Sequence, residues 1–276
     1  IRDVTFDKNH NMYVLQTGSS SIVGGTSPSI LVIDSSGQVK EKIDLPSKYK
    51  YFARLCLNSR YLFLLDSENK AVKRFRLARN GNIAQTLSSN PISFGRAGVG
   101  NGKFTTPVDM CLDSNGHVAV LDGAQSAIQV FRENGVFLFS MGMEGRELGQ
   151  MQRAVALASD QNGRLFCLDD GRKRVLVFKN GAFDRELDCT SRGRLTGLAY
   201  DPYKEILGIA DMDRGIVQRL SLKTGKVTPI NAPWNGEEPS TVRLQKLRES
   251  AMLRCDGTSR FIAVDREGSS LALFNA

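Results

Sequence analysis

Basic and aromatic side chains alternate in residues 48–54, which read Lys-Tyr-Lys-Tyr-Phe-Ala-Arg. Lysine and arginine can pair with the phosphates of a nucleic acid, and aromatic rings can stack on its bases. Further basic residues lie in the segments 96–103, 172–174 and 192–194. The candidate RNA-binding residues are therefore Lys48, Tyr49, Lys50, Tyr51, Arg54, Arg96, Lys103, Arg172, Lys173, Arg174, Arg192 and Arg194. These residue types indicate binding of single-stranded RNA.

The overall charge favours an anionic partner. Lys and Arg number 37 against 29 Asp and Glu, which gives a net charge of +8 and a pI near 9.3. A positive surface attracts polyanions. Acidic residues such as Glu144, Glu147 and Asp213 lie in the same connections, so the excess is local. Two alternatives stay open: the basic residues serve solubility only, and the rings of residues 49–52 pack a linker onto the core.

The residues that could catalyse a reaction are few, and the chain is not expected to be an enzyme. Its two histidines, His10 and His117, fall in predicted turns, whereas a catalytic or metal site of this kind usually gathers several His or carboxylates. The glycine-rich segment 98–103 looks like a phosphate-binding loop, but Ala97 and Phe104 break the Walker pattern. We therefore expect no catalytic residue, no metal and no cofactor, and a connector at this segment.

The elements that position these residues are short strands. Residues 104–142 contain four apolar runs, at 108–112, 118–121, 127–131 and 136–140, separated by three turns. The first and third turns carry Asn115-Gly116 and Asn134-Gly135, and Asn-Gly tolerates the positive φ that tight hairpins need. Four antiparallel strands in about forty residues are typical of one blade of a β-propeller.

The blade pattern recurs with a fixed spacing. Asp113 and Asp122 are nine residues apart, and Phe131 follows nine residues later. The same spacing, within a residue, marks the units at approximately residues 52–87, 151–187, 194–230 and 249–276. The first unit, residues 1–45, keeps only the first interval, from Asp7 to Gln16, and then departs. We predict one all-β domain over residues 1–276, a six-bladed β-propeller with four antiparallel strands per blade. The last unit supplies three strands within the chain, and an insertion at residues 17–29 delays the third strand of the first unit to 30–33.

Each recurring residue has an expected structural role. The Asp that ends a second strand, such as Asp122 or Asp169, should accept backbone N–H bonds and cap the next turn. The recurring phenylalanines should pack between neighbouring blades; they are Phe75, Phe131, Phe178 and Phe274. Connections from second to third strands and from unit to unit should share one face of the propeller, where binding residues are expected.

The segment 94–113 resembles the linker and first strand of the NHL repeat, with Phe94-Gly95, several glycines, Phe104-Thr105-Thr106-Pro107 and a strand that ends in Asp113. The resemblance spans most of the chain, although Gln16 and Asn58 stand where the pattern has Asp. It implies a propeller of the TRIM-NHL type that binds single-stranded, uridine-rich RNA in post-transcriptional regulation of mRNA. The alternative that it implies is a protein-interaction platform that recruits a partner or ubiquitination substrate to a TRIM-type ligase.

The five cysteines show no CxxC pair, and most fall in predicted strands, so a reducing compartment is favoured. No apolar run reaches the roughly 20 residues of a membrane span, so no membrane partner is expected. We expect a cytoplasmic protein. Because the chain begins with Ile1 rather than Met, we also expect it to be a domain of something longer.

Overall fold

A computed structural model describes residues 1–16, 27–46, 49, 51–77, 87, 90–230, 251–265 and 271–275. The chain divides into two compact units, each described by itself below. Unit 1 comprises residues 1–112, 116–125 and 129–139, and unit 2 comprises residues 113–115, 126–128 and 140–276. The candidate residues Lys48 and Lys50 and most of the predicted 17–29 insertion lie outside the described residues.

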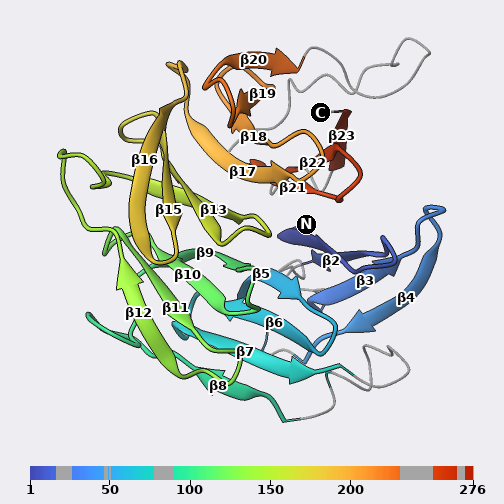
Figure 1. Cartoon of the computed structure of the whole chain (residues 1–276). Helices are drawn as coiled ribbons and strands as arrows, with labels where there is room; N and C mark the ends of the chain where they lie inside the picture. Colours follow the sequence, from blue (N-terminus) through green and yellow to red (C-terminus); the bar gives the residue numbers. More distant parts are fainter. Residues whose placement is uncertain are drawn as a thin grey trace. The chain divides into compact units, whose positions relative to one another are not determined.

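Unit 1 contains antiparallel four-stranded sheets whose strands follow one another in chain order (Figure 1). The first sheet is β1 (Asp3–Phe6), β2 (Met12–Gln16), β3 (Ser29–Ile33) and β4 (Val39–Asp44). The second is β5 (Phe52–Leu57), β6 (Tyr61–Asp66), β7 (Ala71–Arg76) and β8 (Ile92–Phe94). The third, apart from a few residues assigned to unit 2, is β9 (Pro107–Leu112), β10 (Val118–Asp122), β11 (Ala127–Phe131) and β12 (Phe137–Met141).

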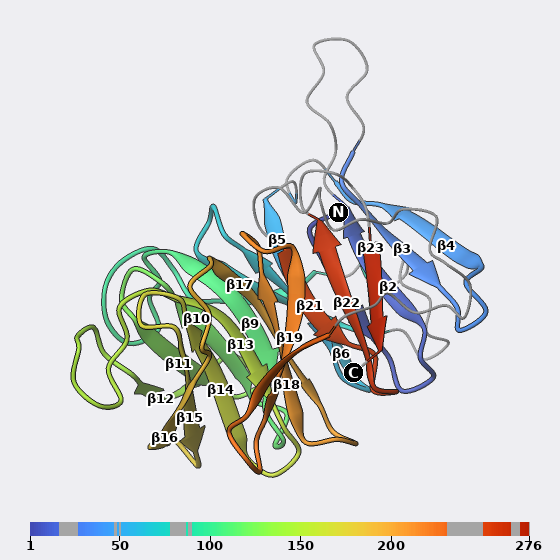
Figure 2. The same cartoon turned by 90° about the horizontal axis from the view of Figure 1, so that it is seen from above.

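Unit 2 repeats the arrangement. One sheet is β13 (Ala154–Ser159), β14 (Arg164–Asp169), β15 (Arg174–Lys179) and β16 (Ala182–Asp188). The next is β17 (Leu195–Asp201), β18 (Ile206–Asp211), β19 (Ile216–Ser221) and β20 (Val227–Ile230). The last has three strands, β21 (Ala251–Cys255), β22 (Arg260–Asp265) and β23 (Leu271–Asn275), of which β22 and β23 lie side by side in Figure 2.

The blade prediction is confirmed at the level of the sheets. In the described part of the chain, five sheets have four antiparallel strands and one has three. The two Asn-Gly turns form hairpins as predicted, with φ of +77° at Gly116 and +88° at Gly135. The delayed third strand of the first unit is also found, as β3. These sheets define an all-β propeller.

The recurring aspartates cap turns as predicted, and they also fix the segment that enters each sheet. Asp122 accepts the backbone N–H groups of Ala124 and Gln125 in its own turn, and those of Thr105 and Thr106 before β9. Asp169 likewise accepts from Gly171, and from Gln152 and Arg153 before β13. One carboxylate therefore joins two connections at the same end of its sheet.

The core lies between successive sheets. Phe131 is buried in a cluster with Phe63 and Val72 of the second sheet and Met110 and Val118 of the third. Phe75 is buried between the first and second sheets. In unit 2 a similar cluster joins β13–β15 to β17–β19. The predicted packing of Phe75 and Phe131 between blades is confirmed.

Candidate functional site

The connector between β12 and β13, residues 142–153, is a compact loop of unit 2. Met151 donates its N–H to the carbonyl of Met143, and Gly145 donates to the carbonyl of Met151, both at 2.9 Å. Gly142 has a φ of +80°, and a Cβ there would overlap the end of the Met151 side chain, which is fully buried. The glycine therefore lets the loop close tightly over Met151.

A carboxylate clamps this connector to the outer strand β16. Glu186 accepts the N–H of Gly149 at 3.0 Å and pairs with the guanidinium groups of Arg172 at 2.7 Å and Arg174 at 2.6 Å. Arg172 also donates to the carbonyl of Gln150 at 2.7 Å. Burial raises the pKa of Glu186, but these donors outweigh burial and hold the pKa below its ordinary value. Hydrogen bonds and ion pairs thus fasten the connector to β16.

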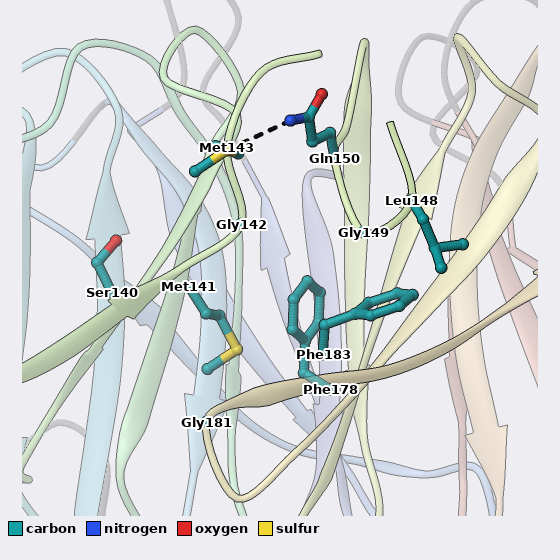
Figure 3. A pocket seen from close by; sticks show the side chains of 10 residues that line it. All are labelled: Ser140, Met141, Gly142, Met143, Leu148, Gly149, Gln150, Phe178, Gly181 and Phe183. Atoms are coloured by element: carbon teal, nitrogen blue, oxygen red, sulfur yellow. Dashed lines mark hydrogen bonds between the residues drawn. The ribbon is translucent and has the colours of Figure 1, made fainter. Parts of the chain in front are cut away.

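A cavity of about 390 Å³ lies beside the clamped connector. Its apolar lining includes Met141, Met143 and Leu148 together with Phe178 and Phe183, whose rings meet edge to face at 6.1 Å. Figure 3 shows Met143 and Gln150 on one side of the cavity and the two phenylalanine rings on the other. We call Met141, Met143, Leu148, Phe178 and Phe183 the connector surface.

The connector surface exposes two apolar side chains. Leu148 is 73% exposed and Met143 is 59% exposed, although both are apolar. The Met143 sulfur accepts a hydrogen bond from the Gln150 side chain at 3.5 Å, which holds Met143 on the rim of the cavity. Exposed apolar groups beside a hollow are typical of surfaces that bind a partner.

The predicted RNA-binding residues of unit 1 have mixed surroundings. Tyr49 is buried and stacks on Phe52 at 4.9 Å, which gives it a packing role. Arg54 is buried beside Asp109. Tyr51 and Arg96 are exposed and Lys103 is half-buried. The carbonyls of Arg96 and Lys103 hold the connector before β9, since they accept from Phe104 and Gln129.

The predicted RNA-binding residues of unit 2 fall into two groups. Arg172 and Arg174 bind Glu186 beside the connector, as described above. Lys173 pairs with the buried Asp170 at 2.5 Å and donates to the carbonyl of Gly193 at 2.6 Å, which brings it to the loop of Arg192 and Arg194. Both of these arginines are exposed. Lys173, Arg192 and Arg194 therefore come together, while Arg172 and Arg174 take part in the clamp.

Met143 and Leu148 were not among the residues predicted from the sequence. The sequence does contain a signal for them: Met143 and Leu148 are apolar residues in a glycine-rich, charged segment, 142–150, of the kind that connects two blades. The equivalent connector of unit 1 carries Val99, which is also 73% exposed.

Metal-ligating side chains do not gather in the described residues: no group of three His, Cys, Asp or Glu there could hold an ion. His10 and His117 lie in the β1–β2 and β9–β10 turns, where the sequence predicted them. All five cysteines are thiols outside any disulfide. No helix in the described ranges is long and apolar enough to cross a membrane.

Solved structures with this fold include enzymes. The chain is similar to virginiamycin B lyase from Staphylococcus aureus, with 10% identity and a TM-score of 0.60 over 100% of this chain and 84% of that one. It is also similar to a structural genomics protein of unknown function from Bacteroides thetaiotaomicron, with 11% identity and a TM-score of 0.64 over 99% of this chain and 68% of that one. A protein of unknown function from Bacteroides caccae matches with 14% identity and a TM-score of 0.58 over 94% of this chain and 84% of that one. No family model and no curated protein matches the sequence.

These neighbours establish the class of the chain as a β-propeller, at the level of the fold. They also correct the prediction that the chain is not an enzyme. That prediction rested on the position of two histidines in turns, yet a propeller of this architecture is a lyase in Staphylococcus aureus. Because the fold carries catalysis there, the number and position of histidines are not grounds for excluding it here.

Proposed function

We propose that this chain is a protein-interaction platform and that a partner binds at the connector surface of unit 2. The propeller fold is consistent with such a role, and the exposure of Leu148 and Met143 beside the cavity is the observation that carries the proposal. A binding surface of this kind combines an apolar anchor site with polar main-chain groups.

The partner that fits this surface is an extended protein segment with one large apolar side chain. A cavity of about 390 Å³ can take such a side chain, with the Phe178 and Phe183 rings on one side and Met141 and Met143 nearby. Because Glu186 and Arg172 already hold the connector, little conformational entropy is lost on binding. Strand β16 is the last strand of its sheet, so its outer edge offers main-chain groups close by.

The NHL resemblance supports the finer version of this proposal, a six-bladed propeller that serves as the recruiting module of a TRIM-type protein. The three-stranded sheet would be its last blade. RNA binding has less support than the protein platform, because Tyr49 and Arg54 are buried and Arg172 and Arg174 are paired with Glu186.

The test is selection of binders from a random peptide library, followed by affinity measurements with two variants. Leu148→Asp places a charge on the connector surface, and Tyr203→Asp is the matched control, since Tyr203 is equally exposed, at 73%, in the β17–β18 turn. We expect peptides with an aromatic or aliphatic anchor whose affinity falls about tenfold or more with Leu148→Asp and stays unchanged with Tyr203→Asp. Selected peptides that bind both variants like the original protein would contradict the proposal.

A further inference from the structure

A second surface of unit 2 presents arginines. Arg153 precedes β13, Arg192 and Arg194 lie in the loop between β16 and β17, and Arg214 lies in the turn between β18 and β19. The Arg153 side chain is 60% exposed, and the other three residues are exposed. We call these four residues the arginine patch.

The turn between β14 and β15 joins two of these connections. Asp170 pairs with Arg153 and with Lys173, and it accepts the N–H of Leu195 at 2.6 Å. The Lys173 ammonium reaches the carbonyl of Gly193 at 2.6 Å. The buried Asp170 and its neighbour Lys173 therefore hold the segment of Arg153 in contact with the loop of Arg192 and Arg194.

The remaining turn joins the same group. Arg194 donates its N–H to Asp213 at 2.9 Å, and its carbonyl accepts the N–H of Met212. Arg214 donates its N–H to Asp211 at 3.2 Å, and Asp211 also accepts from the Ser191 hydroxyl at 2.5 Å. The β18–β19 turn is thus bound directly to the Arg192–Arg194 loop.

Two acids of this region, Asp170 and Asp211, are buried, and two, Asp188 and Asp213, are exposed. Asp170 and Asp211 are each 1% exposed and are hydrogen-bonded to backbone or side-chain donors. Asp213 is exposed, but one of its oxygens accepts the Arg194 N–H. The exposed Arg192, Arg194 and Arg214 therefore stand on this surface with the exposed Asp188 and Asp213 beside them, while Arg153 is paired with Asp170. Guanidinium groups bind carboxylates through paired, charge-assisted hydrogen bonds.

An acidic protein segment suits this surface better than RNA does. Binding of single-stranded RNA without base pairing relies on aromatic side chains that stack on bases. Among the described residues of unit 2 the exposed large apolar side chains are Met143, Leu148 and Tyr203. Tyr203 lies after the C-terminal end of β17, whereas Arg194 lies before its N-terminal end. Met143 and Leu148 belong to the connector surface. The patch therefore offers charges without an exposed aromatic ring.

We propose that the arginine patch binds a protein segment rich in Asp and Glu. This inference rests on the proposed function, since it names a chemical feature of the partner. The partner would place an apolar anchor on the connector surface and an acidic stretch on the patch.

The test uses fluorescence anisotropy with the whole 276-residue chain and three labelled probes: a Glu-Gly repeat peptide, a Gln-Gly repeat peptide and oligouridine. Arg192→Gln with Arg194→Gln removes two charges from the patch. Lys179→Gln with Arg185→Gln is the matched control, because it removes two exposed charges from β15 and β16 instead. The Leu148→Asp variant is measured in parallel.

We expect the Glu-Gly peptide to bind, to weaken as salt is added, and to lose about tenfold or more in affinity with the patch variant while the control variant changes less than about twofold. The Gln-Gly peptide should not bind. Equal losses in the two double variants would overturn the proposal, because the attraction would then come from net charge. Absence of Glu-Gly binding would overturn it as well. The proposal would also be overturned if the patch variant weakened the binding of oligouridine but not the binding of the Glu-Gly peptide.

The outcomes also separate this inference from the proposed function. If Leu148→Asp leaves all selected peptides bound while the patch variant loses the Glu-Gly peptide, the connector surface is wrong and the arginine patch stands. If Leu148→Asp abolishes binding of the selected peptides while the patch variant leaves the affinity for the Glu-Gly peptide unchanged, the proposed function stands and this inference fails.

Discussion

The Arg54 guanidinium donates from Nε to Oδ1 of Asp109 at 2.9 Å, and both side chains are less than 10% exposed. The pair joins β5 to β9 in unit 1. Its partners are 55 residues apart in the chain, so the contact becomes visible only when the sheets are placed side by side. A residue whose type suggests a contact with RNA is thus a structural cation between two blades.

Removal of this cation should be costly. Arg54→Met leaves the Asp109 carboxylate buried without its cation, and we expect the free energy of unfolding to fall by about 3–5 kcal/mol. Adding Asp109→Leu should recover part of the loss, because the buried carboxylate is then removed together with its cation, although the Met110 N–H loses Asp109 as an acceptor. Urea unfolding of the three proteins measures both effects. Unchanged stability of Arg54→Met would show that the pair contributes little to the fold.

Gly142 should resist substitution more strongly than Gly116, a turn glycine with a similar φ. Gly142→Ala combines the strain of φ at +80° with overlap on the Met151 side chain, so we expect a loss of about 2–4 kcal/mol. Gly116→Ala is the matched control, because its φ is +77° and no atom lies within 4 Å of the added Cβ. It should cost only about 1 kcal/mol. Equal losses in thermal unfolding would argue that crowding against Met151 is unimportant.

Asp169 should be a strong stabilising residue. Asp169→Ala removes the acceptor for the N–H groups of Gln152, Arg153 and Gly171, and we expect a loss of about 2–3 kcal/mol. Asp188→Ala removes an exposed acceptor of one N–H, from Thr190, and should change stability by no more than about 0.5 kcal/mol. Chemical denaturation distinguishes the two. Similar values for both would contradict the dual capping role of Asp169.

The clamp on the connector should depend on pH in a defined direction. The pKa of Glu186 lies below its ordinary 4.5 in the folded protein, so its stabilising contribution is complete well above that value. The contribution is lost as the pH falls through the lowered pKa. The stability difference between the original protein and Glu186→Gln should therefore be largest at neutral pH and shrink below about pH 4.5. A difference that grows on acidification would reverse the expected sign.

The Cys189 thiol should be inert in the folded protein. Burial, assisted by the nearby Asp188 carboxylate, raises its pKa to about 12, so the reactive thiolate is scarce at neutral pH. We expect iodoacetamide to leave Cys189 unmodified in native protein and to label it after unfolding, as read by peptide mass spectrometry. Rapid native labelling would mean that the loop before β17 opens readily.

The sequence predicted the parts of this structure that depend on local geometry. The nine-residue spacing placed Asp122, Asp169 and Phe131 correctly, since turn caps and alternating strand faces follow from residue type and spacing. Contacts between distant segments did not follow in the same way. Glu186 accepts a hydrogen bond from Gly149, which lies 37 residues away in the sequence, and no local sequence pattern predicts that contact. The exposure of Leu148 was missed for the same reason, because the side of a connector that faces solvent depends on which strands the connector packs against.

Site-specific photo-crosslinking tests the central claim most directly. A photoreactive amino acid placed at position 148 lies on the connector surface, and the same amino acid at position 203 is equally exposed elsewhere in unit 2. With a peptide selected on the original protein, we predict a crosslink from position 148 that excess unlabelled peptide suppresses, and none from position 203. Crosslinks of equal yield from both positions, or from position 203 alone, would contradict the assignment of this surface as the partner-binding site.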